Sequence, residues 1–244
     1  MTGAAPKVDP LAGHGRSPHT GRADVAIAGT VVAADCDGAL YWRDEGLLVV
    51  ADLHLEKGSS FAARGVLLPP YDTAATLGRL ASLIARHAPR VVVALGDSFH
   101  DGDGFRRIAT ADRATLSALQ RGRDWIWIAG NHDPDPAVGV GGSFGAVLAI
   151  GPLTFRHAPT GADGEIAGHL HPVARVSARG RTVSRRCFAS DGRCMVMPAF
   201  GAFAGGLNVR HRAFVDIFGT SAFTAHVLGD GRLYSFTADR CVAD

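Results

Sequence analysis

Side chains that bind metals or move protons stand directly after three apolar runs of this sequence. Asp52 and His54 follow GLLVVA, Asp97 follows RVVVALG, and Asn131 and His132 follow DWIWIAG. In parallel α/β sheets, ligands bind outside the carboxyl ends of the strands. If the three runs are neighbouring strands, these five side chains meet at one edge of a sheet.

Three histidines farther along the chain extend this set. His157 ends the run LTFRH, and His169 and His171 stand two apart in AGHLHP. In an extended chain, residues i and i+2 face the same side, so both imidazoles can address one site. Each motif alone has a plain structural explanation, such as a turn or a surface histidine. Five such motifs in order, three of them behind apolar runs, favour a common site.

The types of these side chains predict a pair of metal ions. Carboxylate, amide and imidazole groups offer oxygen and nitrogen but no sulfur, which suits Mn²⁺, Fe or Zn²⁺. The set is too large for one tetrahedral ion and fits two ions that share a carboxylate. Paired ions about 3.5–4 Å apart clamp a phosphoryl group during in-line displacement. The candidate ligands are Asp52, His54, Asp97, Asn131, His157, His169 and His171.

The elements that must position these groups alternate between strands and helices. Short strands are expected within 25–50, and uninterrupted apolar strands at 90–96 and 124–130. Amphipathic patterns predict helices within 69–87 and 110–122. This alternation indicates an α/β fold with helices against a central sheet. From about residue 144 onward the pattern changes to short strands with glycine turns and almost no helix.

Composition and cysteine usage bound the class of protein. The chain has 244 residues, 47% of them apolar, enough for a sizeable core. We expect a disordered tail at 1–23, rich in Gly, Pro, Ser and Thr, and a single domain at 24–244. The N-terminus lacks the apolar region of a secretory signal, and no window has 18 uncharged apolar residues, so no membrane span is predicted. Four cysteines without a CxxC pair indicate reduced thiols and a cytoplasmic protein.

The distribution of charge gives a divided answer about nucleic acid. The formal charge is +2, and the chain after Arg22 is neutral, with 22 basic and 22 acidic residues. Bulk charge therefore gives no nucleic-acid signal. Between Arg175 and Arg193, however, six arginines stand with one acid, Asp191. This segment is either a DNA contact or a solvated hairpin.

The motif series DxH, GDxxHD, GNHD, a lone histidine and GHLHP resembles that of the calcineurin-like metallophosphoesterases. The resemblance spans 52–171. It implies a two-sheet β sandwich flanked by helices, the αββα architecture, with a dinuclear metal centre. Carried over, Asp52, His54 and His171 would hold one ion with Asp97. Asn131, His157 and His169 would hold the other, again with Asp97, which bridges the two.

A finer resemblance covers the chain from about residue 24 to its end. ADLHLEKGSSFAARGVLLPPYDT, LGDSFHD and PAFGAFAGGLN are similar to segments of the ligase-associated DNA-damage-response endonucleases (PdeM-like). The resemblance implies a bacterial enzyme that acts on DNA and is functionally associated with a DNA ligase, an exonuclease and a helicase. The oligomeric state is not indicated.

The resemblance also assigns catalytic roles to two histidines. His132 would contact the phosphate or protonate the leaving oxygen. His100, three residues after Asp97, would orient or tune His132, as the matching histidine does in related repair nucleases; alternatively it only caps its loop. Asp101 and Asp133 are equally suited to this orienting work, since an acid–base histidine needs a partner that fixes its tautomer.

Two further features have open interpretations. Lys57 and Arg64 follow the first motif in a glycine-bearing loop, where they would bind a second phosphate or remain solvated. Phe200 and Phe203 lie among small residues, where they would stack a base or, more simply, pack into the core.

The favoured function is a phosphodiesterase acting on DNA, a repair endonuclease in which a metal-bridging hydroxide attacks phosphorus in line. One alternative is a small-molecule phosphohydrolase that cleaves nucleotide or lipid-linked pyrophosphates. A remote alternative is a catalytically inactive scaffold on the same fold, against which the full ligand set argues.

Overall fold

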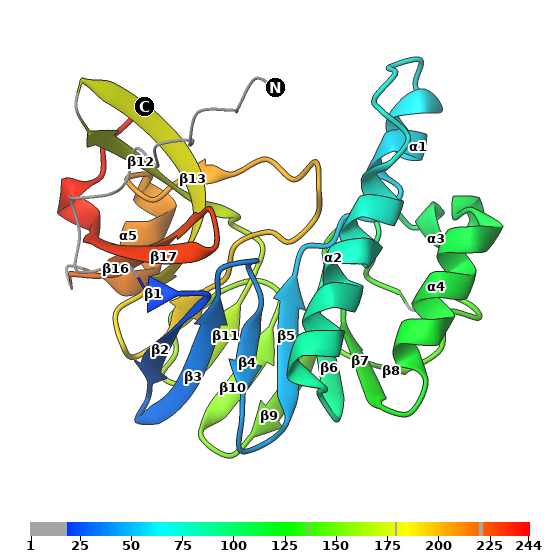
Figure 1. Ribbon diagram of the computed structural model, residues 1–244, viewed down its shortest axis with the longest axis horizontal. Coiled ribbons are helices and arrows are strands. Elements are labelled where there is room, and N and C mark those ends of the chain that lie inside the picture. Colours follow the sequence, from blue (N-terminus) through cyan, green and yellow to red (C-terminus); the bar gives the residue numbers. More distant parts are fainter. Residues whose placement is uncertain (1–18, 136, 179, 220–221) are drawn as a thin grey trace, which may run out of the picture.

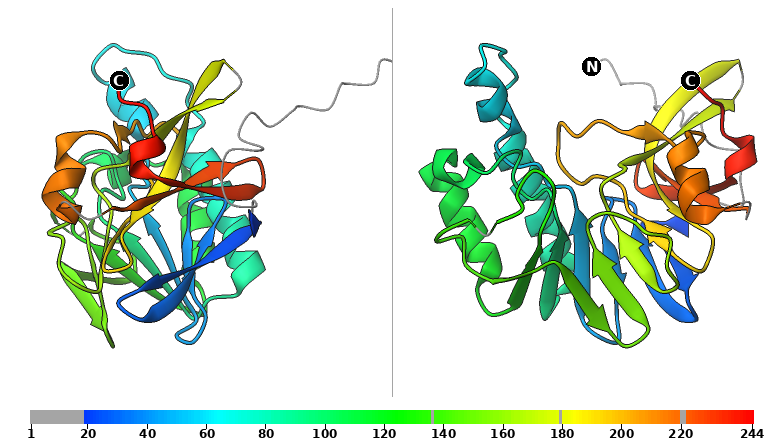
Figure 2. Two further views of the ribbon diagram at one scale, coloured as in Figure 1. Left: turned by 90° about the vertical axis from the view of Figure 1, so that its left-hand side faces the viewer. Right: turned by 180° about the vertical axis from the view of Figure 1, so that it is seen from behind.

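Two stacked β-sheets with helices on their outer faces form this protein (Figures 1 and 2). The computed structural model describes residues 19–135, 137–178, 180–219 and 222–244. The two-sheet α/β architecture confirms the fold that the motif series implied.

The first sheet contains the apolar runs that precede the candidate ligands. Its last four strands are mutually parallel, which requires crossover connections between them. The crossovers carry α1 (Lys57–Ala62), α2 (Asp72–His87), α3 (Gly104–Arg107) and α4 (Thr110–Gln120). In spatial order its strands are β2 (Arg22–Ile27), β3 (Thr30–Asp35), β4 (Leu40–Trp42), β5 (Leu47–Ala51), β6 (Val91–Leu95), β7 (Asp124–Ile128) and β8 (Ser143–Gly145).

The second sheet uses the strands at the two ends of the described chain and the β-rich second half. Along its main path the strands are β1 (His19–Thr20), β17 (Arg232–Thr237), β16 (Thr224–Gly229), β13 (Arg181–Ser190), β14 (Met195–Val196), β11 (Glu165–Ala167), β10 (Leu153–Arg156) and β9 (Val147–Ile150). Off this path, β12 (Pro172–Ala178) pairs with β13 and with β15 (Leu207–Asn208). Helix α5 (Arg212–Phe218) precedes β16, and a short 3₁₀ turn (Ala238–Arg240) follows β17.

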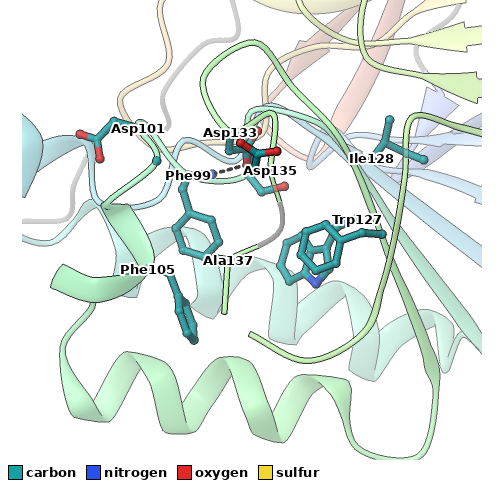
Figure 3. A pocket seen from close by; sticks show the side chains of 11 residues that line it. Phe99, Asp101, Phe105, Trp127, Ile128, Asp133, Asp135 and Ala137 are labelled. Atoms are coloured by element: carbon teal, nitrogen blue, oxygen red, sulfur yellow. Dashed lines mark hydrogen bonds between the residues drawn. The ribbon is translucent and has the colours of Figure 1, made fainter. Parts of the chain in front are cut away.

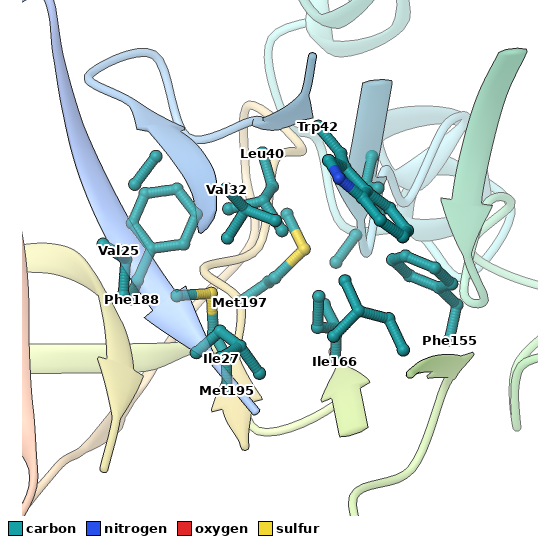
Figure 4. Packing of buried hydrophobic residues seen from close by; sticks show 14 of the residues in the cluster. Val25, Ile27, Val32, Leu40, Trp42, Phe155, Ile166, Phe188, Met195 and Met197 are labelled. Atoms are coloured by element: carbon teal, nitrogen blue, oxygen red, sulfur yellow. The ribbon is translucent and has the colours of Figure 1, made fainter. Parts of the chain in front are cut away.

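Three apolar clusters hold the layers together. The central cluster lies between the sheets and combines side chains from both, such as Trp42 and Phe155 (Figure 4). A second cluster packs Leu77, Leu80 and other residues of α2 and α4 on the outer face of the first sheet. A third packs α5 on the second sheet. Because the central cluster draws on both sheets, their relative position is set by the core, and so is the position of any site built between them.

The predicted strands and both predicted helices are present within a few residues of their expected ends. Helix α5 was not predicted, because its seven residues are too few for a clear helical period. Of the predicted disordered tail, 1–23, residues 1–18 lie outside the described residues. The described end of this segment is paired in strands instead: His19 pairs with Leu233 of β17, and Arg22, the first residue of β2, pairs with Asp35 of β3. Within the described residues, no helix is long and apolar enough to cross a membrane.

Candidate metal centre

Strand register aligns the ends of the three parallel strands at one edge of the first sheet. Leu95 of β6 pairs with Ala51 of β5 on one side and with Ile128 of β7 on the other. Asp52 follows Ala51 directly, and Asp97 lies two residues after Leu95. The expected gathering of side chains at this edge is therefore present in the backbone itself.

The second sheet delivers the remaining histidines in the same way. Strands β10 and β11 are parallel, and Arg156 pairs with Ala167 at their ends. His157 comes next in one strand, while His169 and His171 follow the other. The candidate site thus lies between the carboxyl ends of parallel strands from both sheets.

The backbone is held in an uncommon conformation at most of these positions. Positive φ values occur at Asp52 (52°), His54 (43°), Asp97 (46°), His169 (69°) and His171 (47°). For residues other than glycine the left-handed region costs on the order of 1 kcal/mol or more and persists only where the surroundings enforce it. Five cases at one site indicate that the fold enforces the direction of these side chains.

Two glycines allow the site to be this tight. A Cβ on Gly96 would lie 2.5 Å from the His157 ring, and one on Gly168 would lie 2.5 Å from Asp52 Oδ2. Glycine is required at both positions because any side chain would displace a candidate ligand.

One group of candidate ligands is formed by Asp52, His54 and His171, whose ligand atoms all lie within 4.8 Å of one another. His171 Nε2 is 3.3 Å from His54 Nε2 and 3.3 Å from Asp52 Oδ1. These three residues belong to one half of the predicted ligand set.

A second group is formed by Asp97, His157 and His169. His157 Nε2 lies 3.1 Å from His169 Nδ1 and 3.4 Å from Asp97 Oδ1. Asn131, on the loop after β7, places its Oδ1 2.9 Å from the same His157 nitrogen. This matches the other half of the predicted set.

Asp97 stands between the two groups. Its Oδ1 faces His157, whereas its Oδ2 lies 3.9 Å from His54 Nε2. One oxygen toward each group is the arrangement that a carboxylate shared by two ions requires.

The spacing and charge of these groups fit metal ions. Ligand bonds of about 2.0–2.2 Å place neighbouring ligand atoms about 3–3.5 Å apart, which is the spacing seen between the imidazole nitrogens. Asp52 and Asp97 are 0% and 2% exposed. Within the described residues neither forms an ion pair with Lys or Arg; their charged contacts are histidines only. Two buried carboxylates without a permanent cation are costly, and divalent ions would neutralise them.

Two of the ligand histidines, His54 and His169, are held in the neutral form that a metal requires. Burial, together with the neighbouring His171, His132 and His100, lowers the pKa of His54 to about 2. Burial and then His157 likewise lower the pKa of His169. A neutral imidazole keeps a free lone pair, so the ring can coordinate a cation near neutral pH.

His132 is exposed and oriented by a backbone group. Its Nδ1 lies 2.8 Å from the carbonyl oxygen of His100, to which it can donate. Its Nε2 is then directed to the site, 4.0 Å from Asp97 Oδ2. The side chain predicted for acid–base work is therefore both accessible and held in one tautomer.

The structure brings His100 to His132, although the contact differs from the expected one. The two rings stack with centroids 5.1 Å apart, but the hydrogen bond runs from His132 Nδ1 to the main-chain carbonyl of His100, not to its ring. The His100 ring instead places Nδ1 3.5 Å from Nδ1 of His54. Burial, followed by the charge of Lys57, lowers its pKa to about 4. His100 thus lies between the acid–base candidate and a candidate ligand.

Asp133 and Asp101 hold the loop after β6, and neither is hydrogen-bonded to a histidine of the described residues. Asp133 Oδ2 accepts from the backbone amides of Ser98 and Phe99 at 2.8 and 3.0 Å (Figure 3). Burial raises the pKa of Asp133 to about 6. Asp101 forms a bidentate ion pair with Arg107. Orientation of His132 by either carboxylate is therefore not what the structure shows.

Lys57 and Arg64 lie at the rim of the site, on and just after α1. Both cations lie over the ring of Phe61, at 5.8 and 5.7 Å from its centroid, and that ring is 5.6 Å from the His100 ring. Lys57 Nζ donates to the Phe203 carbonyl at 3.0 Å. Among the described residues neither cation pairs with a carboxylate, which leaves both charges available to an anion. Phe61 gave no signal in the sequence.

The two phenylalanines that were considered for base stacking differ. Phe200 is buried in the cluster on the outer face of the first sheet, under the guanidinium of Arg79. Core packing is the correct interpretation for it. Phe203 is half-buried, next to Lys57.

A third group that contains acids also has the spacing of metal ligands in the described chain: Asp35, Cys36 and Asp37. It begins at the last residue of β3, and Arg86 and His87 of α2 contact Asp35 at 2.9 Å each. No motif in the sequence predicted this group.

Comparison with known proteins agrees with this geometry. The family model of calcineurin-like phosphoesterases matches residues 47–166. The crystal structure of Pseudomonas putida nuclease MPE is similar with a TM-score of 0.67 and 28% identity, covering 88% of this chain and 100% of that one. Yfce, a phosphoesterase from E. coli, is more distant, with a TM-score of 0.37 and 12% identity over 79% and 98% of the chains. No curated protein matches the sequence.

The matched segment contains the motifs from Asp52 to His157, and the fold places His169 and His171 beside them. The family uses divalent metals, and the ligand atoms found here suit such ions. The chain belongs to the calcineurin-like metallophosphoesterases and is a metal-dependent phosphoesterase.

Proposed function

We propose that this protein is a nuclease that hydrolyses phosphodiester bonds of DNA at a dinuclear centre. One observation carries the chemistry: two groups of candidate ligands meet at a single buried carboxylate, Asp97, beside the exposed His132. The likeness to a nuclease over 88% of the chain supports the substrate.

The residues divide the work as follows. Asp52, His54 and His171 would hold one ion and Asn131, His157 and His169 the other, with Asp97 shared. When bound, the two ions supply the positive charge that activates a water and stabilises the charge developing on the phosphoryl oxygens. Mn²⁺ is the ion that we propose, with Fe or Zn²⁺ as the other ions that suit the ligands.

His132 serves the leaving oxygen. Because Nδ1 is directed to the His100 carbonyl, the proton available to substrate is the one on Nε2. In its imidazolium form the ring can donate that proton to the departing oxygen, which general acids do with gains of about 10²–10⁴-fold. His100 keeps this ring in place by stacking and by its carbonyl.

Lys57 and Arg64 would bind a neighbouring phosphate of the DNA strand. Their charges are not neutralised by carboxylates within the described chain, and they stand on the side of the site that α1 forms. Contacts of this kind position a nucleic acid without reading its sequence.

We further propose a role in DNA repair in the cytoplasm, in functional association with a DNA ligase, an exonuclease and a helicase. The resemblance to ligase-associated endonucleases supports the partners. All four cysteines are free thiols, which is typical of a reducing compartment.

A second candidate, a small-molecule phosphohydrolase, is favoured by the arginine-rich segment. Arg175 binds Asp244, and Arg193 binds Asp163, so these charges are engaged within the protein. The segment therefore offers less to DNA than its composition suggested.

A comparison of substrates with Mn²⁺ supplied tests the proposal. Closed circular DNA, linear single strands, an aryl phosphodiester and a dinucleotide polyphosphate are incubated with the wild-type protein. We expect cleavage of DNA and of the aryl diester. Turnover of the dinucleotide with DNA left intact would overturn the nuclease assignment and leave the phosphoesterase chemistry standing.

A further inference from the structure

Two features of the sequence have no part in the proposed chemistry: the arginine-rich segment and the run PAFGAFAGGLN. The structure joins them at Arg186 of β13. Unlike Arg175 and Arg193, Arg186 forms no ion pair with a carboxylate of the described chain. It faces the connection between β14 and β15 instead.

The Arg186 guanidinium is surrounded by backbone carbonyls of that connection. Nη1 donates to Ala199 O at 2.9 Å and approaches Phe200 O at 3.5 Å. Nη2 donates to Gly201 O at 2.8 Å and approaches Ala202 O and Ala204 O at 3.3 Å each. One side chain thus contacts five backbone carbonyls within residues 199–204.

We call residues 199–207 the strap, because both of its ends bind the backbone of candidate ligands. At its start the amide of Phe200 donates to Ala51 O at 2.8 Å, and the amide of Gly201 donates to Asp52 O at 3.0 Å. A Cβ on Gly201 would overlap the carbonyl of Leu53. The strap therefore lies directly against the segment that carries Asp52 and His54.

At its other end the strap reaches the second sheet. The amide of Leu207 donates to His171 O at 3.0 Å. Between its ends, Lys57 Nζ and Thr76 Oγ1 bind Phe203 O and the Ala202 amide. In Figure 1 this orange segment reaches from the β12–β13 side toward α1.

The two ligand groups differ in their relation to the strap. Asp52 and His171, which the strap joins, belong to the same group. Within the described residues, no hydrogen bond links the strap to Asp97, Asn131, His157 or His169. A loss of order in the strap would therefore act first on Asp52 and His171, and would reach the other group only indirectly, for example through the His169 amide, which donates to Asp52 Oδ2 at 3.0 Å.

Arginine suits this position better than lysine. Its planar fork holds several carbonyl oxygens at once, whereas an ammonium is a single point charge. Burial, and then the charge of Arg79, lowers the pKa of Arg186 to about 10, so the side chain remains charged near neutral pH.

We propose that Arg186 is a positioning residue for the metal site formed by Asp52, His54 and His171. It orders the strap, which fixes the main chain of Asp52 from one sheet relative to that of His171 from the other. The inference rests on the proposed dinuclear centre.

Counting bound metal tests it. Wild type, Arg186→Ala and Arg186→Lys are dialysed against a series of Mn²⁺ concentrations, with the neighbouring Arg185→Ala as the control. Loss of groups that support metal ligands typically lowers affinity by about 10–100-fold. We expect one equivalent in Arg186→Ala to weaken by at least about 10-fold, the other to remain, and Arg186→Lys to lie between this variant and wild type.

Hydrogen exchange of 199–207 in the metal-free proteins gives a readout that is independent of metal. Faster exchange in Arg186→Ala, but not in Arg185→Ala, is expected. Equal weakening of both metal equivalents, or unchanged exchange of the strap, would overturn the role of Arg186. If wild type itself bound less than one equivalent, the dinuclear centre would fail first, and the proposal would fall with it.

Discussion

Asp35, at the end of β3, and the acids after β5 and β6 are buried to the same degree but neutralised in different ways. Asp35 is 1% exposed and contacts Arg86 and His87, each at 2.9 Å. Asp52 and Asp97, equally buried, have only histidines as charged neighbours in the described chain. Both places have ligand spacing. Spacing alone therefore does not identify a metal site. The distinguishing feature is that the buried carboxylates of the metal centre have no Lys or Arg partner in the described chain.

Removing the shared carboxylate tests this difference most severely. Asp97→Ala should reduce both metal uptake and hydrolysis to background, because each ligand group loses an oxygen and the shared charge disappears. Mn²⁺ dialysis and aryl phosphodiester turnover measure the two effects. Full activity in this variant would contradict the role of Asp97 as the carboxylate shared by the two ions.

His132 separates chemistry from metal binding at the same site. His132→Ala should keep both ions but lower turnover by about 10²–10⁴-fold, the usual contribution of a general acid. The same dialysis and turnover measurements apply. Equal loss of metal in this variant and in Asp97→Ala would contradict the assigned roles.

Asp35 provides the opposite case. Asp35→Asn should leave metal content and turnover unchanged but lower the free energy of unfolding by about 1–3 kcal/mol, because Arg86 and His87 lose a charged acceptor. Urea unfolding of the metal-free protein measures the change. Loss of a metal equivalent in this variant would show that Asp35 binds metal although it has an Arg partner, so that ligand spacing alone would identify a metal site.

The stability of the metal-free protein should depend on pH because the pKa values of two histidines, His54 and His100, are lowered in the folded state. The pKa values of His54 and His100 fall from 6.5 to about 2 and about 4 in the folded state, so below pH 6.5 the unfolded chain binds more protons. Stability should therefore decrease as the pH falls from 6.5 toward 4. Asp133, whose pKa is raised to about 6, takes up a proton more readily in the folded state and so opposes this trend. It is a single group, whereas His54 and His100 both favour the loss of stability.

Thermal unfolding at several pH values in a chelator measures this slope. The Asp35→Asn variant should show the same slope from a lower starting point, since the histidines of the metal site are unchanged in it. Stability that increased on acidification over this range would contradict the lowered histidine pKa values.

The smallest effect is expected at the rim. Arg64→Ala should weaken DNA binding and reduce the slope of log affinity against log salt by about 1, the result of losing one phosphate contact. Turnover of a small aryl diester should not change, because that substrate does not extend to the rim. An unchanged salt slope would show that Arg64 does not contact a phosphate and remains solvated.

The first sheet and its ligands could be predicted from the sequence because the pattern there is local. Apolar strands, helices of ordinary length and residues at strand ends follow rules that a single chain displays. Asp52, Asp97 and Asn131 were placed in this way, and strand register accounts for their meeting. His157, His169 and His171 were included because of their residue type and motif order, but their division between the two ions needed the family resemblance, because local sequence patterns do not give the order of strands in the second sheet.

What the sequence did not reveal depends on long-range contacts. The arginine-rich segment was visible, but only the fold shows that Arg186 binds the carbonyls of residues 199–204 and that Arg175 pairs with Asp244. The same holds for Phe61 and for the Arg86–Asp35 pair, whose members lie 51 positions apart. Charge composition indicates how many cations exist and not which of them are already neutralised.

The number of Mn²⁺ ions bound per chain tests the central claim most directly. Equilibrium dialysis of the chelator-treated protein, followed by metal and protein analysis, should give two equivalents in wild type and in Asp35→Asn. Asp97→Ala should bind none. Fewer than one equivalent in wild type at saturating Mn²⁺, or two in Asp97→Ala, would contradict the account.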